Sequence, residues 1–554
     1  MKYPAMLLLA ALSFSPQQTG SYDLLVSDCR IVDGSGNPWY RGDIAIKDGR
    51  IQRIQRDLHV NAARVIDAGG MVASPGFIDM HTHSEYTLLR DGNAESKIRQ
   101  GVTLEVAGET ATIAPRRPDM DDSDLTQAGI KERWATFREY FDVVNKKGIS
   151  VNLMCYVAAA QLRKMVLGDD FRKPTAGELD RMKDLARAAM EDGALGLVSI
   201  LEAPEGEEPG AVPDTQELIE ISKAVAPFGG MYATHLRNQT DHFLESIQEA
   251  ALIGRTAGIP AEIFHLKSAG KPNFGNMERG LQEIEKQRLA GLDFGADIYP
   301  YIAASHGLAT EVPRWAQEGG AARFIERLKD PALRARLRKE TDAYIETKYY
   351  NEEKKVGGYD AVMIASTRKQ NDPDVGKTIA EIAKERGISG ADAVFQLLVE
   401  NNANVGIVMF YMSESDMRKG LAHPWVSVCS DASAMSPAFG GKPHPRTYGT
   451  FPRILGKYVR EVKLLRLEDA VRKMTSLPAA RLGLRDRGTL REGNWADVVI
   501  FDPDKIIDRA TFENPHQYPL GVEYVLVNGT VVIDKGQHTG ARPGRVLYGP
   551  GRKG

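Results

Sequence analysis

Alternating apolar and polar residues occupy both ends of the chain. From Tyr22 to about Val72, short runs of this kind are separated by the turns DGSGNP, KDGR and DAGG, which is typical of antiparallel strands. The same texture returns after about residue 485, in WADVVIFDPD and VEYVLVNGTVVIDKG, where Asn-Gly and Lys-Gly mark hairpin turns. Because edge strands need partners, we predict that residues 21–75 and 485–546 together form one small β-sandwich domain.

Between the two ends, short apolar runs alternate with stretches of helical periodicity. This alternation is typical of parallel strands joined by crossover helices, and eight such units close a TIM (β/α)8 barrel. We therefore predict an α/β fold with a TIM barrel over residues 76–484. The eight apolar runs are FIDMH (77–81), VTLEVA (102–107), VNLMCYV (151–157), LGLVSI (195–200), MYATH (231–235), AEIFH (261–265), GADIY (295–299) and VSVCS (426–430).

The connection between the seventh and eighth runs is too long for a simple crossover. Between Tyr299 and Val426 the chain is charged and helical in pattern, as in FIERLKDPALRARLRKETDAYIE and GKTIAEIAKERGISGADAVFQLLVE. Long insertions at the top of a barrel often shape or cover a site. We predict that residues 306–408 form a helix-rich subdomain inserted after strand seven.

The composition favours a small-molecule partner. Of the 554 residues, 42% are apolar and 26% are charged, and the net charge of -3 provides no field for nucleic acid or an anionic membrane. The cysteines Cys29, Cys155 and Cys429 have no CxxC spacing, so they predict neither a disulfide framework nor a cysteine zinc site. The sequence leaves the oligomeric state open.

Residues 1–20 have the pattern of a secretory signal peptide. One lysine precedes an apolar run from Ala5 to Leu12, and a polar stretch with proline and glutamine follows. The run is much shorter than the roughly 20 residues of a membrane-spanning helix, so no membrane anchor is expected. We predict a periplasmic or secreted protein; a cytoplasmic protein with a loosely docked apolar tail is the alternative.

Polar residues that can bind a metal follow five of the predicted barrel strands. Because barrel active sites are built at the carboxyl ends of the strands, we expect these side chains to converge. A His-x-His pair on a strand is weak evidence alone, although both rings lie on one face. Four of the eleven histidines at strand ends are a stronger signal. The residues are His81, His83, Glu109, His235, His265 and Asp431.

Imidazoles and carboxylates together suit a divalent ion such as zinc. A catalytic zinc ion lowers the pKa of its bound water from 15.7 toward about 7 and polarises a substrate carbonyl. A carboxylate beside that water can accept its proton and later deliver it to a departing nitrogen. Asp431, after the last strand, is the candidate for this role.

Several further motifs resemble one family. The stretches GFIDMHTHSEY, YATHLRN, FHLKSAG, DIYPYIAASHGL, PHPRTYGTFPRIL and VNGTVVIDKGQHTGARPGRVL are similar to those of the N-acyl-D-amino-acid deacylases (D-aminoacylases) of the amidohydrolase superfamily. The resemblance runs from about residue 22 to the C-terminus and implies a metal-bearing barrel beside a β-sandwich. It implies that His81 and His83 serve one metal position, that His235 and His265 serve another, and that Asp431 is the catalytic acid/base.

The chain departs from the family after the second strand. Where the D-aminoacylases have a cysteine, this sequence has AGET, so Glu109 would be the bridging or second-site ligand. A carboxylate is a harder ligand than a thiolate. This change should weaken the preference for zinc, so we expect one or two Zn²⁺ ions, with Mn²⁺ or Co²⁺ as alternatives.

Other residues are candidates for substrate binding. Lys267 and Arg446 supply cations, and Tyr299 and Ser305 supply hydroxyl groups. An arginine fork with a lysine and hydroxyl donors makes a clamp for a carboxylate, and the resemblance implies that role for the matching residues. By the same resemblance Met412 would line a side-chain pocket.

These observations predict a metal-dependent amidohydrolase that cleaves the amide bond of N-acyl-D-amino acids. The D configuration follows from the resemblance only. Three further departures from the family pattern around the predicted mouth favour a substrate other than a simple acetyl D-amino acid: the stretches DASAMSPAFGGKPHPR, GALGLVSILEAPEG and VAAAQLR. A dipeptidase, a carbamate hydrolase or a cyclic amidase on the same scaffold is the alternative, and a non-catalytic protein that binds a metal or a carboxylated ligand is a third hypothesis.

Overall fold

The computed structural model describes residues 21–109, 113–120, 125–126, 128–201, 213–369 and 371–553. The predicted signal peptide lies outside these residues. Among the described helices, none combines the length and the apolar character that crossing a membrane requires.

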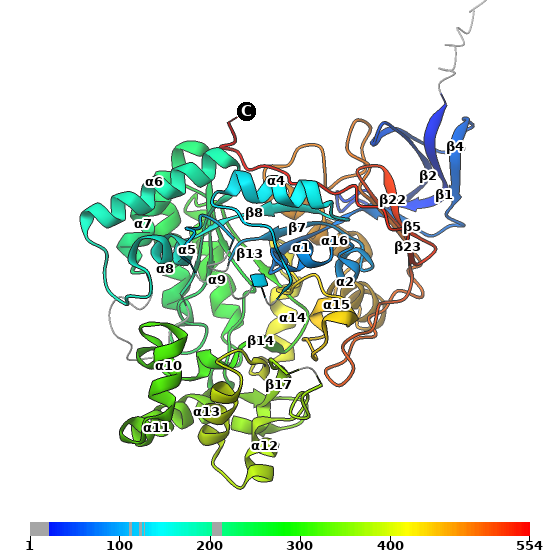
Figure 1. Ribbon diagram of the computed structural model, residues 1–554. Helices are drawn as coiled ribbons and strands as arrows, with labels where there is room; N and C mark the ends of the chain where they lie inside the picture. Colours follow the sequence, from blue (N-terminus) through cyan, green and yellow to red (C-terminus); the bar gives the residue numbers. More distant parts are fainter. Residues whose placement is uncertain are drawn as a thin grey trace, which may run out of the picture.

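One nine-stranded sheet joins strands from both ends of the chain. β5 pairs antiparallel with β20, with Val498 opposite Pro75, so the two ends meet at the middle of the sheet (Figure 1). The order is β23-β22-β21-β20-β5-β1-β2-β3, and β4 pairs with β1. The predicted sandwich architecture and its bounds stay predictions. The strands are β1 (Tyr22–Ile31), β2 (Tyr40–Lys47), β3 (Arg50–Gln55), β4 (Ala62–Asp67), β5 (Val72–Pro75), β20 (Val498–Phe501), β21 (Val522–Val527), β22 (Thr530–Asp534) and β23 (Gln537–His538).

All eight apolar runs form strands, but these strands lie in two parallel sheets and not in one closed sheet. One sheet has the order β6-β7-β8, and the other has the order β19-β13-β12-β11-β10-β9. The run VNLMCYV is split between β8 and β9. Every residue of β7 is buried, as expected for a parallel strand covered on both faces. The strands are β6 (Phe77–Thr82), β7 (Val102–Ala107), β8 (Asn152–Cys155), β9 (Val157–Ala158), β10 (Gly196–Ile200), β11 (Met231–His235), β12 (Ala261–Ile263), β13 (Phe294–Ile298) and β19 (Val426–Val428).

Amphipathic helices connect and cover the parallel strands. Two of them begin with a capping box, made by Thr136 with Glu139 and by Thr175 with Glu178, which satisfies backbone N–H groups that the first turn leaves unpaired. The helices are α1 (Thr87–Arg90), α2 (Glu95–Ile98), α4 (Phe137–Lys147), α5 (Ala159–Leu167), α6 (Ala176–Asp192), α7 (Thr215–Val225), α8 (Phe243–Ala257), α9 (Met277–Leu289), α14 (Glu414–Ala422), α15 (Arg446–Arg453), α16 (Leu467–Met474) and α17 (Ser476–Arg481).

The long segment between β13 and β19 contains helices and a small sheet. Its helices gather at one end of the molecule, away from the nine-stranded sheet (Figure 1). β18 is the middle strand of an antiparallel sheet with β14 and β17, which the helical sequence pattern did not predict. The predicted bounds of the insertion stay a prediction. The elements are β14 (Ala303–Gly307), α10 (Gly320–Lys329), α11 (Pro331–Lys348), β15 (Tyr350–Asn351), β16 (Val356–Gly357), β17 (Val362–Ser366), α12 (Ile379–Arg386), α13 (Gly390–Glu400) and β18 (Gly406–Phe410).

The last residues of the chain return to the parallel strands. Gly544 N donates to Ile149 O and Leu547 N donates to Leu153 O, both at 2.8 Å. The segment HTGARPGRVL therefore runs beside β8 and links the nine-stranded sheet to the sheet that carries His81.

Candidate metal centre

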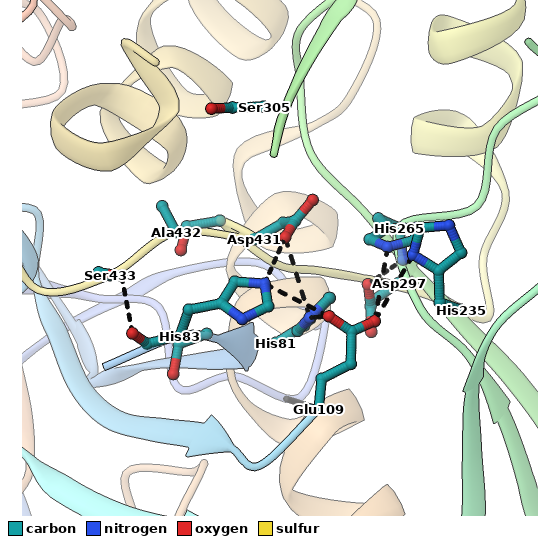
Figure 2. Close-up of polar contacts among 12 residues, drawn as sticks. His81, His83, Glu109, His235, His265, Asp297, Ser305, Asp431, Ala432 and Ser433 are labelled. Carbon is teal, nitrogen blue, oxygen red and sulfur yellow. Dashed lines mark hydrogen bonds and ion pairs between the residues drawn. The ribbon is translucent and has the colours of Figure 1, made fainter. Parts of the chain in front are cut away.

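The ends of five parallel strands bring the predicted metal-binding residues together (Figure 2). His81 belongs to β6 and His83 follows it, while His235 is the last residue of β11. His265 and Asp431 follow β12 and β19, and both have a left-handed backbone, with φ of 38° and 49°. β12 ends earlier than the run AEIFH predicted, because the backbone turns before His265 and aims its ring at the other strand ends.

The carboxylate of Glu109 lies between two pairs of imidazoles. Its Oε2 atom is 3.1 Å from His81 Nε2 and 3.4 Å from His83 Nε2. Its Oε1 atom is 3.6 Å from His235 Nδ1 and 3.8 Å from His265 Nε2. One carboxylate oxygen therefore faces each pair, as expected for a residue that bridges two metal positions.

The donor atoms have the spacing and the unmet bonding capacity of a metal site. Three groups each hold their donor atoms within 4.8 Å of one another: His81 with Glu109 and His265, His81 with His83 and Asp431, and His81 with Asp297 and Cys429. Glu109 Oε1 is buried and makes no hydrogen bond, and an unpaired buried carboxylate oxygen is costly unless a cation satisfies it. The residues therefore fit one or two divalent ions with nitrogen and oxygen ligands.

The carboxylates of the site are held in the charged form. Burial alone raises the pKa of Glu109, but the neighbouring His81 and His235 bring it well below its usual range. Burial also raises the pKa of Asp431, and the guanidinium of Arg446 is the largest of the charges that lower it well below its usual range. Both groups are therefore anionic at neutral pH.

His83 and His265 differ in the direction of their pKa shifts. Burial lowers the pKa of His265 well below its usual range, and the neighbouring Lys267 lowers it further. Burial lowers the pKa of His83 as well, but the hydrogen bond to Asp431 and the charge of Glu109 raise it to about 9. Metal ligation requires neutral imidazole, so a metal ion at His83 would displace a proton.

Asp431 connects the histidine cluster to a buried cation. Its Oδ1 atom is 3.0 Å from His83 Nε2, and its Oδ2 atom is 2.8 Å from Arg446 Nη1. Arg446 Nη1 and Nε are both buried and make no hydrogen bond. The contact between Arg446 and Asp431 is therefore an ion pair without hydrogen-bond geometry. Arg446 therefore retains N–H groups that can donate hydrogen bonds to a bound carboxylate.

A cavity of about 730 Å³ opens over this cluster. His83, Glu109, His235, His265 and Asp431 line it. Many of the other lining residues come from the segment between β13 and β19, so this segment helps to shape the cavity. From that segment the lining residues include Ser305, His306, Thr310, Arg314, Tyr344 and Tyr411.

The predicted substrate-binding residues fall into two places. Lys267, Ser305 and Arg446 line the large cavity. Tyr299 and Met412 line a much smaller cavity beside it, about 10 Å³ in volume, where Tyr299 Oη lies 3.8 Å from Met412 Sδ.

Two of these cavity residues already have partners. Ser305 Oγ donates to Ile407 O at 2.7 Å and lies apart from the histidine cluster (Figure 2). Lys267 Nζ is 2.6 Å from His265 Nδ1.

Sequence reasoning missed two polar residues next to the site. The backbone N–H of Arg446 donates to His444 Nδ1, and His444 Nε2 donates to Ala303 O, both at 3.0 Å. Asp297 Oδ1 accepts the backbone N–H of His265 at 2.6 Å. His444 lies in PHPR and Asp297 in DIYPY, two motifs in which only neighbouring residues were predicted to belong to the site.

Comparisons with known proteins give the family. The model of the amidohydrolase family matches residues 64–533. D-aminoacylase from Alcaligenes xylosoxydans xylosoxydans is 35% identical over 543 residues, covering 96% of this chain and 99% of that protein. N-acyl-D-aspartate deacylase from the same organism is 33% identical, covering 95% of each.

Solved structures agree with the sequence comparison. A crystal structure of D-aminoacylase covers 95% of this chain and 100% of its own, with 33% identity and a TM-score of 0.79. N-acyl-D-glutamate deacylase from Bordetella bronchiseptica, complexed with zinc and a phosphonate inhibitor, has 30% identity and a TM-score of 0.79, covering 96% of this chain and 100% of its own. The predicted resemblance is confirmed: this chain belongs to the amidohydrolase family, in the group that contains the D-aminoacylases.

Proposed function

We propose that the protein hydrolyses the amide bond of N-acyl-D-amino acids and releases a carboxylate and a free amino acid. The observation that carries this proposal is the convergence of four imidazoles, Glu109 and Asp431 beside one cavity, which is also lined by Arg446 and Lys267. A cleft with ionisable groups of shifted pKa is the expected setting for such chemistry. The relatives carry the names D-aminoacylase and N-acyl-D-aspartate deacylase, which describe action on N-acyl-D-amino acids.

The metal set would consist of His81 and His83 at one position, His235 and His265 at the other, and Glu109 between them. When bound, a divalent ion supplies Lewis acidity at a carbonyl oxygen and lowers the pKa of water. Zinc suits these ligands, and a carboxylate in the bridging position also suits Mn²⁺ or Co²⁺. Glu109 Oε1, buried without a hydrogen bond, supports this assignment.

Asp431 would carry the proton of the reaction. Its carboxylate is ionised and faces the same space as the histidines, so it can accept a proton from the attacking water and return it to the departing nitrogen. The contact with His83 at 3.0 Å fixes one oxygen of Asp431, and the ion pair with Arg446 holds the other. The proton transfer thus starts from an oriented base.

The substrate carboxylate would bind at the cationic wall. Arg446 Nε and Nη1 are buried without hydrogen-bond partners, and Lys267 lines the same cavity. Arg446 is paired with Asp431, and its Nη2 donates to Ser305 O at 3.4 Å, but its Nε and Nη1 protons can still form charge-assisted hydrogen bonds to a carboxylate. Tyr299, whose ring lies 4.7 Å from the Arg446 guanidinium carbon, would orient that guanidinium, and Ser305 and Met412 complete the proposed binding residues.

A substrate panel with metal analysis tests this proposal. The panel contains N-acyl-D-amino acids, their L enantiomers, dipeptides, N-carbamoyl amino acids and cyclic amides. We expect hydrolysis of the N-acyl-D compounds, one or two equivalents of metal, and loss of activity with a chelator. Faster hydrolysis of a dipeptide, a carbamate or a cyclic amide would replace this function with the alternative. Binding without turnover of any compound would indicate a non-catalytic protein.

We also propose that the two parallel sheets are the two arcs of one TIM barrel. Thr82 of β6 forms a parallel bridge with Ala432, just after β19. On the other side only Tyr156 separates β8 from β9, and its N–H donates to Ala107 O at 2.8 Å. A crystal structure in which the strands stay in two separate layers would refute the barrel.

Finally, we propose export to the periplasm or the medium, on the strength of the signal-like pattern of residues 1–20. Cell fractionation and N-terminal sequencing test this. Cleavage near residue 20 in an exported fraction is the expected result. A cytoplasmic protein that keeps Met1 would contradict it.

A further inference from the structure

A buried ion pair lies directly behind the turn that carries Asp431. Lys97 of α2 and Asp79 of β6 are both fully buried, and Lys97 Nζ is 2.9 Å from Asp79 Oδ2. Neither residue belongs to the proposed metal set or to the wall of the large cavity.

The pair contacts the residues on both sides of Asp431. The N–H of Ser430 donates to Asp79 Oδ1 at 2.7 Å. Lys97 Nζ donates to Ser430 Oγ and, at 2.8 Å, to Ala432 O. The ammonium thus uses all three of its protons within this cluster.

The turn needs such a restraint. Asp431 has φ of 49°, a left-handed conformation that is uncommon outside glycine, asparagine and aspartate and that persists when its surroundings hold it. Two backbone hydrogen bonds to the β6 side also reach this turn: the N–H of Asp431 donates to His81 O at 2.9 Å, and the N–H of His83 donates to Ala432 O at 3.3 Å. Without the pair, the flanking residues 430 and 432 would lose three polar contacts.

Stability alone does not account for the pair. Removing two charges from water costs several kcal/mol per ion, and replacing a buried ion pair with apolar residues of similar volume is often neutral or stabilising. A lysine and an aspartate at full burial are therefore better explained by the geometry they impose than by the free energy of unfolding.

We propose that Lys97 and Asp79 are positioning residues, which hold residues 430–432 so that the Asp431 carboxylate faces the metal site. This proposal rests on the proposed function of Asp431 as the proton carrier. A displacement of about 1 Å in a catalytic group can cost roughly 100-fold in rate.

The test uses a double variant, Lys97→Met with Asp79→Leu, which removes both charges together and avoids leaving one of them buried alone. We expect a folded protein with unchanged metal content and nearly unchanged KM, but with kcat lowered about 100-fold. A crystal structure should show the Asp431 carboxylate displaced from Arg446. Wild-type kcat together with an unmoved Asp431 would overturn the proposal.

Two further variants distinguish a fall in kcat caused by a displaced Asp431 from one caused by loss of the fold. Ser430→Ala removes one acceptor of Lys97 and leaves the ion pair, so we expect a smaller fall in kcat, about tenfold, with the same KM. The control replaces another buried pair, Arg163 with Glu217 at 2.6 Å, by Arg163→Met with Glu217→Leu. It should change the melting temperature without changing kcat.

The two proposals can fail separately. If the wild type hydrolyses no compound of the panel, the proposed function fails, while the crystal structure of the double variant still tests the position of Asp431. If the wild type is active and Ser430→Ala and the double variant match it in kcat, only the positioning role fails.

Discussion

Arg446 Nη1 lies 2.8 Å from Asp431 Oδ2, and both side chains are buried. The ion pair joins the proposed substrate clamp to the proposed proton carrier. It lowers the pKa of Asp431, and the charge of Asp431 in turn raises the pKa of Arg446 against the effect of burial. Binding of a substrate carboxylate at Arg446 would therefore weaken the attraction between Arg446 and Asp431. Asp431 would become more basic when the substrate is in place.

Asp431→Asn should abolish the proton transfer and leave the metal bound. Asparagine keeps the shape of the side chain but cannot accept the proton of water, and general base catalysis contributes about 10²- to 10⁴-fold. We expect kcat to fall by that range with unchanged metal stoichiometry, measured by steady-state kinetics and elemental analysis. Turnover at the wild-type rate would contradict the role of Asp431.

Arg446→Met should raise KM strongly and also lower kcat. The variant removes the donors proposed for the substrate carboxylate and leaves Asp431 buried without its cation; truncating one partner of a buried pair costs about 3–5 kcal/mol. The control is Arg453→Met, in the same PHPRTYGTFPR segment, because Arg453 pairs with Asp508 at 2.9 Å and lies outside the cavity wall. An unchanged KM in Arg446→Met would place the substrate carboxylate elsewhere.

The convergence of the site could be predicted because it follows from topology. His81, His235 and His265 each end an apolar run, and parallel strands put such residues at one edge whatever the connecting segments do. His265 and Asp431 could be assigned to the site without knowledge of their unusual backbone angles. The ability of these imidazoles and carboxylates to bind a metal could likewise be predicted from residue types alone.

The contacts within the insertion could not be predicted. The hydroxyl of Ser305, one of the proposed substrate-binding groups, donates to Ile407 O where β14 pairs with β18, and Ile407 is 102 residues away in sequence. Such antiparallel pairing has no local signature when the partner strands are separated by helices. Lys97 was also missed, because α2 is only four residues long and a single lysine in a short connection is usually solvated.

Glu109→Ala should lower both metal content and activity. The carboxylate is the one ligand that faces both pairs of histidines, so its removal should abolish activity and release at least one equivalent of metal. Full activity with unchanged metal stoichiometry would exclude Glu109 as a ligand.

Glu109→Cys tests the choice of metal at the same position. A thiolate is a softer ligand than a carboxylate, so this variant should bind zinc in preference to Mn²⁺ more strongly than the wild type does. The comparison is made by competition between the two metals at equal concentration. An unchanged zinc-to-manganese ratio would show that residue 109 does not set the preference.

Glu105→Gln should remove a destabilisation that grows as the pH rises. Glu105 lies opposite Asp79 in the β6–β7 pairing, and both of its side-chain oxygens are buried without hydrogen-bond partners. Burial raises its pKa from 4.5 to about 7, and Lys97 opposes that shift only in part. In the unfolded chain the same group ionises at its ordinary pKa.

The sign of the effect follows from this difference. Well below pH 4.5 Glu105 is protonated in both the folded and the unfolded chain, so its ionisation does not affect stability. Between about pH 4.5 and pH 7 mainly the unfolded chain loses the proton, so the free energy of unfolding falls as the pH rises. The loss is at most about 3 kcal/mol, at 1.36 kcal/mol per pKa unit. Glutamine does not titrate, so urea unfolding at pH 5 and pH 8 should show a larger loss of stability in the wild type than in Glu105→Gln. Equal losses in the two proteins would mean that Glu105 ionises normally in the folded state.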